Sequence, residues 1–205
     1  TVGWRINGET TYALEGSAFI AGAAVQWLRD GLNIISTAAE IESLAESVPD
    51  SGGVIFVPAL AGLGAPHWRP DARALLWGMT GGTTRAHIAR AVLDGIALQL
   101  TDILDAMAAD LGSPLKELRV DGGAARNNLL MQRQADLIQA DIRRPQVLET
   151  TGLGSALMAG LAVGIWDNLN AVSEKWALDR HFEPSLSSGE VAQTRAKWDT
   201  AVQRS

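Results

Sequence analysis

Residues 118–128 read LRVDGGAARNN, and this stretch carries the clearest structural pattern in the chain. A short apolar strand is expected to end at Asp121, two glycines make a turn, and a helix begins near residue 126. Glycine lets a ligand approach the main chain, and a helix N-terminus offers free N–H groups that suit phosphate. The alternative is a plain strand-to-helix connection with Asn127 near the cap. The spacing alone leaves both interpretations open.

Strand and helix patterns alternate on both sides of this turn. Two short strands, over 3–6 and 10–14, are joined by Asn7-Gly8, a pair typical of hairpins. The order of strands first, then strand and helix in alternation, predicts an α/β fold with a mixed sheet flanked by helices. We expect residues 1–205 to form one domain. The pattern predicts helices over 17–29, 38–48, 85–111, 126–139, 151–166, 169–176 and from 188, and further strands over 54–57, 74–79, 118–120, 142–144 and 181–182.

The composition limits the classes of function that the chain can have. There is no cysteine, which excludes disulfides and thiolate metal sites and fits a reducing compartment. The net charge of −6 argues against a nucleic-acid partner, because phosphate contacts need a basic face. The longest apolar run, 157–166, is too short to cross a bilayer. We therefore expect a cytoplasmic protein, and its start at Thr1 within a strand pattern favours a piece of a longer chain.

Gly22 and Gln26 form a second candidate site. They lie four residues apart, so a helix places them on one face. Within the predicted helix 17–29, Gly22 is an interior glycine, which costs about 1 kcal/mol relative to alanine. Close packing against another helix is the commoner reason for such a glycine. The other reason is the approach of a ligand, with Gln26 as a polar contact.

The remaining candidates favour structural roles. His67 lies in a long Gly/Pro loop over 58–71, where no partner for a catalytic base is identifiable, so a packing or surface role is favoured. Asp102 and Asp105 lie three residues apart on the predicted long helix, a spacing most often found on a solvated face. Residues 150–156 start a helix with hydroxyls and glycines, and capping is favoured there over a ligand contact.

Several stretches together resemble the FGGY family of carbohydrate kinases. ALLWGM at 74–79, followed by His87-Ile88 and by AVLD at 91–94, fits the second signature of that family. Three further groups of residues resemble the family members that phosphorylate glycerol. The three groups are YALEGS at 12–17 with QWLRD at 26–30, GLGAPHW at 62–68, and VDGGA at 120–124. The similarity to the family runs from about Trp4 to beyond Phe182.

The resemblance implies an actin-like, ribonuclease H-like domain that binds most of an ATP molecule. Carried over by position, Gly22, Gln26, Gly123 and Asn127 match nucleotide-contacting residues of the family. The implied substrates are ATP and glycerol, and the implied metal is Mg²⁺, held mainly through the nucleotide and the other half of the enzyme. The full-length protein is expected to be a homo-oligomer without a membrane partner.

The family's catalytic aspartate, its glycerol contacts and its N-terminal phosphate loop are expected upstream of Thr1. We therefore assign no catalytic and no metal-binding residue to this chain, and we expect it to be inactive by itself. Arg126 stands where a small or apolar residue is expected, and solvent is favoured over a phosphate contact. Two other functions stay open: the same half of a sugar kinase acting on xylulose or a similar sugar, and a domain that binds nucleotide or a protein partner without catalysis.

Overall fold

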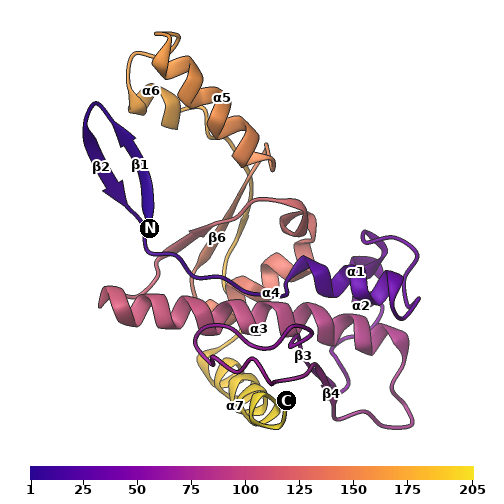
Figure 1. The fold of residues 1–205 in the computed structure, drawn as a ribbon. Helices are drawn as coiled ribbons and strands as arrows, with labels where there is room; N and C mark the ends of the chain where they lie inside the picture. The colour runs from indigo at the N-terminus through magenta and orange to yellow at the C-terminus, as the bar shows by residue number, and fades with distance from the viewer.

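The computed structural model describes residues 1–205 and shows a body of packed helices with a small sheet above it (Figure 1). A hairpin and a pair of helices project beyond that sheet. The elements in chain order are β1 (Val2–Ile6), β2 (Glu9–Tyr12), α1 (Gly22–Asp30), α2 (Glu40–Glu46), β3 (Ile55–Val57), β4 (Leu75–Trp77), α3 (Arg85–Leu111), β5 (Glu117–Arg119), the 3-10 turn η1 (Gly123–Arg126), α4 (Asn128–Ile138), β6 (Asp141–Pro145), α5 (Thr150–Ala162), α6 (Leu169–Ser173), β7 (Leu178–Phe182) and α7 (Ser188–Arg204).

Helix α3 runs through the middle of the body and has the bounds that the sequence predicts. Thr84 and His87 form a capping box at its start. Gly112 ends it in the left-handed conformation, with φ at 66°. Apolar side chains that recur at three and four residues, such as Val92 and Ile96, are buried against the neighbouring elements. Helix α3 contacts α1, α2, α4 and β3, so it is the scaffold that positions them.

The sheet is mixed, as predicted, but it has only three strands. β5 pairs with β6 in parallel, Glu117 opposite Asp141, and β6 pairs with β7 antiparallel, Ile142 opposite Phe182. The hairpin β1–β2 and the pair β3–β4 are separate two-stranded ladders. The hairpin turn at Asn7-Gly8 is confirmed, with both residues at positive φ. β3 and β4 stay outside the main sheet because β3 packs between α3 and α7.

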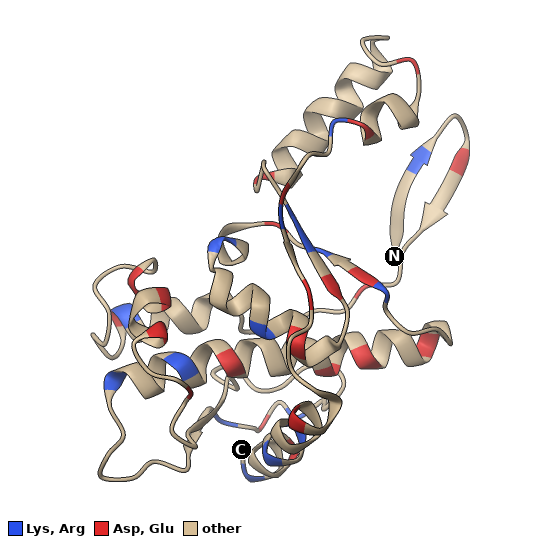
Figure 2. Ribbon diagram, turned by 180° about the vertical axis from the view of Figure 1, so that it is seen from behind, with Lys and Arg blue, Asp and Glu red and all other residues tan.

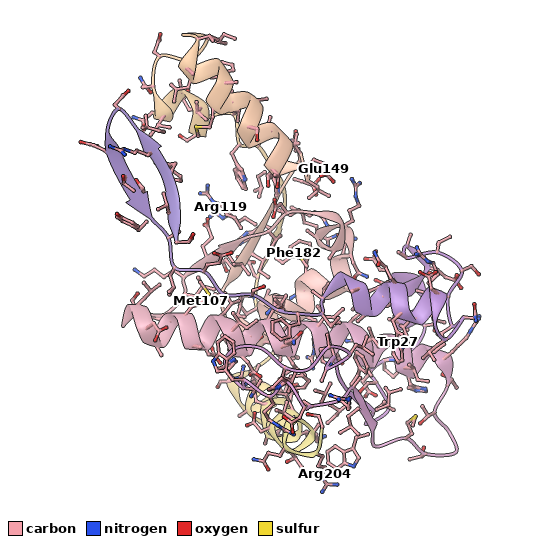
Figure 3. All side chains as sticks on the ribbon, in the orientation of Figure 1. Trp27, Met107, Arg119, Glu149, Phe182 and Arg204 are labelled. Carbon is pink, nitrogen blue, oxygen red and sulfur yellow. The ribbon has the colours of Figure 1, made fainter.

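Helix α7 closes the lower face of the body (Figure 1). Its Trp198 is fully buried, and Phe56 of β3 is buried nearby in the same core cluster. Trp27 points from α1 into this core and stacks on Phe56 with ring centroids 5.7 Å apart (Figure 3). The stacked pair joins α1 to β3, and β3 in turn contacts α7, so the three elements share one core.

The helix predicted over 17–29 begins only at Gly22. The preceding segment follows an irregular path across α3, because Gly16 lies so close to Ile103 that no Cβ would fit there, and Phe19 packs against Gly64. Gly22 is therefore the first residue of a helix and not an interior glycine. A Cβ at Gly22 would meet nothing within 4 Å, so the prediction of close helix packing at this residue is wrong.

The predicted capping role of residues 150–156 is also wrong. Glu149 occupies the N-cap position of α5 and makes no side-chain capping bond. The Thr150 hydroxyl donates instead to the carboxylate of Asp121, which follows β5. This contact ties the start of α5 to the end of the sheet, a relationship between distant segments that local sequence does not reveal.

Charged residues are dispersed over the elements, with acidic positions recurring along α3 (Figure 2). Lys and Arg residues lie between them, with Arg143 and Arg144 adjacent on β6, and the net charge of the chain is −6. None of the helices has both the length and the apolar character that a bilayer crossing requires.

Candidate functional site

A pocket of about 550 Å³ opens between α1, α2, α3 and the turn that precedes α4. This volume lies within the range typical of small-molecule and cofactor sites. Two glycines, Gly22 and Gly123, lie on its rim, and four polar side chains line it: Gln26, Glu42, Arg126 and Asn127. The apolar walls consist of Val25, Ala38, Ala39, Ile41, Leu93, Ile96, Ala124 and Leu130.

Helix α1 presents Gly22 and Gln26 to this pocket. Ala24 and Leu28 are buried and hold the opposite face of the helix against the core. Gln26 is exposed one turn after Gly22, so its amide is available to a ligand. Because Gly22 has no side chain, the main chain at the start of α1 is open to close approach.

The turn between β5 and α4 supplies the other side of the pocket. Gly122 adopts φ of 79°, a left-handed conformation that suits glycine, and its N–H donates to the carbonyl of Leu148 at 2.9 Å. The N–H groups of Gly123 and Ala124 begin the 3-10 turn and have no acceptor within the chain. A Cβ on Gly123 would meet nothing within 4 Å. The turn thus offers two free donors to an anionic or polar ligand.

Helix α4 itself offers no free N–H groups at its start, so this part of the prediction is wrong. Asn127 is the N-cap, and its Oδ1 accepts from Leu130 N–H at 2.8 Å. Glu42 of α2 accepts from the N–H groups of Asn128 at 2.7 Å and Leu129 at 3.4 Å. The amide nitrogen Nδ2 of Asn127 has no partner, and it is the part of this residue that a ligand could use.

Arg144 of β6 fixes the turn between β5 and α4 from the side of the sheet. Its guanidinium donates to the carbonyls of Ala125 at 2.8 Å and Arg126 at 3.2 Å, and it pairs with Asp179 of β7 at 2.8 Å. It also donates to the Asn128 side chain at 3.0 Å. The sheet therefore fixes the position of the turn by the planar, multidentate geometry that only arginine provides.

The structure brings Gly22, Gln26, Gly123 and Asn127 together around this one pocket. Arg126 is exposed, as expected, and it also lines the pocket. Sequence reasoning missed Glu42 and Arg144. Glu42 is one of several acids on the polar face of a predicted amphipathic helix, and Arg144 lies in a short strand among other charged residues, so no local pattern distinguishes either.

Comparison with known proteins assigns the chain to a family. A family model described as the C-terminal domain of the FGGY family of carbohydrate kinases matches residues 5–163. The chain belongs to the FGGY family of carbohydrate kinases. The four residues of the pocket named from sequence all lie within the matched part of this FGGY domain.

Two curated relatives of this FGGY chain are glycerol kinases. The glycerol kinase of Dechloromonas aromatica is 60% identical over the whole chain, and that of Burkholderia multivorans is 60% identical over 98% of it. The chain spans 41% and 40% of the length of these relatives.

Solved structures show the same fold. The glycerol kinase of Plasmodium falciparum, solved with ADP, is 42% identical, with a TM-score of 0.89 over 97% of this chain and 39% of its own. The xylulose kinase of Lactobacillus acidophilus is 22% identical, with a TM-score of 0.74 over 91% of this chain and 38% of its own, and shows the fold alone. The predicted actin-like α/β fold is therefore confirmed.

In this FGGY domain the second signature supports both the pocket and the core. Leu93 lines the pocket, whereas the next residue, Asp94, pairs with Arg133 of α4 at 2.9 Å and with Arg90 at 3.6 Å. Burial raises the pKa of the Asp94 carboxyl, and the two arginines oppose that shift. The signature thus ties α3 to α4 directly behind the pocket wall.

His67 makes a structural contact away from the pocket. Its Nε2 lies 2.8 Å from Oδ2 of Asp102, which also accepts from Trp198 Nε1 at 2.7 Å. Asp102 is thus a partner for His67 that the sequence did not reveal, and the packing or surface role of His67 stays a prediction. The prediction of a solvated Asp102 is wrong, since α7 covers it and leaves 6% of the residue exposed, whereas the Asp105 side chain is 60% exposed.

Proposed function

We propose that this chain is the nucleotide-binding domain of an ATP-dependent glycerol kinase, an enzyme that transfers the γ-phosphoryl group of ATP to glycerol and yields glycerol 3-phosphate. The observation that carries this proposal is the 60% identity to curated glycerol kinases over the full chain. The 42% identity to a glycerol kinase solved with ADP supports the nucleotide.

The xylulose-kinase alternative has weaker support. The xylulose kinases among the similar structures are 21–24% identical to this chain over the aligned residues, which reflects the common fold. Substrate contacts in such a kinase need particular side chains, and identity at this level does not carry them over. The 60% identity to a curated glycerol kinase is much higher than the identity to the xylulose kinases, and this favours glycerol as the acceptor.

The pocket suits a nucleotide in chemical terms. Its apolar walls can take the adenine ring, and the free N–H groups of Gly123 and Ala124 can donate to phosphate oxygens. The amides of Gln26 and Asn127 can contact the base or the ribose. The chain has no group of three or more His, Cys, Asp or Glu side chains placed to hold a metal ion. We infer that Mg²⁺ is bound mainly through the nucleotide phosphates.

We further propose a division of labour within the intact enzyme. Residues 1–205 form one domain that binds ATP, and the aspartate base and the glycerol contacts belong to a part of the enzyme outside these residues. Catalysis would rest on positioning and charge neutralisation, with water excluded when the two parts close. The enzyme acts in the cytoplasm as a homo-oligomer. On this proposal the chain alone binds nucleotide and does not phosphorylate glycerol.

The test combines calorimetry with a turnover assay on the 205-residue chain. We expect ADP to bind and glycerol-dependent ADP release to be absent. Gly123→Val should abolish binding, because its side chain blocks approach to the free N–H groups. Gly81→Val is the matched control, since Gly81 is also exposed with nothing within 4 Å of a Cβ but lies outside the pocket. Turnover at a normal kinase rate would overturn the division of labour, and equal ADP affinity of both variants would remove the turn from the site.

A further inference from the structure

Glu42 connects two walls of the pocket that lie far apart in sequence. It belongs to α2, and its Oε1 accepts from the main-chain N–H groups of Asn128 at 2.7 Å and Leu129 at 3.4 Å. Asn128 follows Glu42 by 86 residues. The side chain of one wall therefore caps the helix that begins at the other wall.

The charge of Glu42 gives this contact a second consequence. The N-terminus of α4 carries the positive end of the helix dipole and would by itself attract a phosphate group. The Glu42 carboxylate occupies that position, and the Asn127 side chain takes the next N–H group, that of Leu130. Within this part of the pocket, the donors left for a ligand are the N–H groups of Gly123 and Ala124, the Nδ2 of Asn127 and the exposed guanidinium of Arg126.

We propose that Glu42 is a positioning residue of the nucleotide pocket. It holds the start of α4, and with it the preceding turn Gly123–Asn127, against α2, and it keeps phosphate away from the start of α4. The nucleotide is thereby bound in one orientation, with its phosphates at Gly123 and Ala124. This inference rests on the proposed nucleotide-binding function and adds to it a residue that need not touch the nucleotide.

Loss of Glu42 should leave the domain folded. Ile41 and Ala45 of α2 are buried in the core, and Arg144 holds the turn independently from the sheet. A role confined to stability would lower the melting temperature and leave ligand affinity unchanged. A positioning role lowers affinity in a protein that is still folded at the temperature of the assay.

The experiment compares Glu42→Ala and Glu42→Gln with the control Glu46→Ala, an exposed acid on the same helix outside the pocket. ADP affinity is measured by calorimetry, and folding by thermal unfolding. We expect Glu42→Ala to weaken ADP about tenfold, the size of a lost hydrogen bond to a charged group. Glu42→Gln keeps an acceptor oxygen, so its ADP affinity should fall only about threefold. Unchanged ADP affinity in Glu42→Ala would overturn the proposal.

Amide hydrogen exchange tests the same inference without a nucleotide. In Glu42→Ala the N–H groups of Asn128 and Leu129 should exchange faster, and inorganic phosphate should slow them again, because the anion position is then empty. In the original chain phosphate should have no effect at these two residues. Identical exchange in both proteins would overturn the inference. Absence of ADP binding by the original chain would instead overturn the proposed function, and the exchange comparison would still decide the role of Glu42.

Discussion

The indole Nε1 of Trp198 donates to the buried carboxylate of Asp102 at 2.7 Å, across 96 residues of sequence. The same carboxylate contacts His67 at 2.8 Å and Arg195 at 3.2 Å. One acidic side chain on α3 thus anchors both the loop over 58–71 and helix α7. Because α7 packs on β3 and β4, this contact stabilises the side of the core opposite the pocket.

Replacing Asp102 should therefore be costly. Asp102→Ala leaves the buried indole N–H without an acceptor, and we expect a loss of about 3 kcal/mol in the free energy of unfolding. For a chain of this length that corresponds to a fall of about 6–12 °C in melting temperature. The control is Asp105→Ala, which should change stability by less than about 0.5 kcal/mol because its side chain is exposed. Equal losses in the two variants would show that the buried contact is not what stabilises α7.

Asn127 allows its capping role to be separated from its ligand role. Asn127→Asp retains the acceptor oxygen that caps α4, and Asp and Asn are about equally good caps, so stability should be unchanged. The variant loses the free Nδ2 donor and adds negative charge to the pocket, so ADP affinity should fall by about tenfold or more.

Asn168→Asp is the matched control for that variant. Asn168 caps α6 with the same geometry, its Oδ1 accepting from Ala171 N–H at 3.0 Å, and it lies outside the pocket. Calorimetry should find ADP affinity unchanged there. A full-affinity Asn127→Asp variant would exclude the side-chain amide from the nucleotide site.

Arg144 should affect both stability and binding. In Arg144→Lys a single ammonium cannot reach the carbonyls of Ala125 and Arg126 and the carboxylate of Asp179 together. We expect a loss of about 2 kcal/mol in unfolding free energy, measured by urea titration, and weaker ADP binding. Arg143→Lys is the control, because Arg143 is the preceding residue of the same strand and its side chain is 40% exposed. Binding as tight as in the original chain would show that the turn does not depend on the sheet.

The raised pKa of Asp94 predicts a specific pH dependence of stability. Burial is the main cause, and the folded value lies above the ordinary 3.8, so the folded protein retains a proton that the unfolded chain has already released. The contribution of Asp94 is therefore fully present below pH 3.8 and is lost as pH rises through the folded pKa. Urea unfolding of the original chain and Asp94→Asn between about pH 4 and pH 7 should show the original chain losing relative stability as pH rises. A difference that is constant with pH, or that changes in the opposite direction, would contradict this assignment.

Much of the fold could be predicted from the chain's local patterns. The bounds of α3, the hairpin turn at Asn7-Gly8 and the alternation of strands and helices all follow from periodicity and turn chemistry. The start of α1 could not, because residues such as Gly16 and Phe19 are held in an irregular path by Ile103 and Gly64. Nor could the separation of β3 and β4 from the main sheet, which results from packing between α3 and α7.

The same division applies to the pocket. The sequence patterns alone predicted the turn at 122–123 and an α/β domain. The family resemblance added the four candidate residues Gly22, Gln26, Gly123 and Asn127. Only the tertiary structure decided which donors remain free there. Glu42 reaches Asn128 across 86 residues and Arg144 reaches Ala125 from the sheet, so the N-terminus of α4 is closed and the N–H groups of Gly123 and Ala124 stay open. Local sequence determines where the main chain turns. The acceptors of the N–H groups in those turns belong to segments that come together only when the chain is folded.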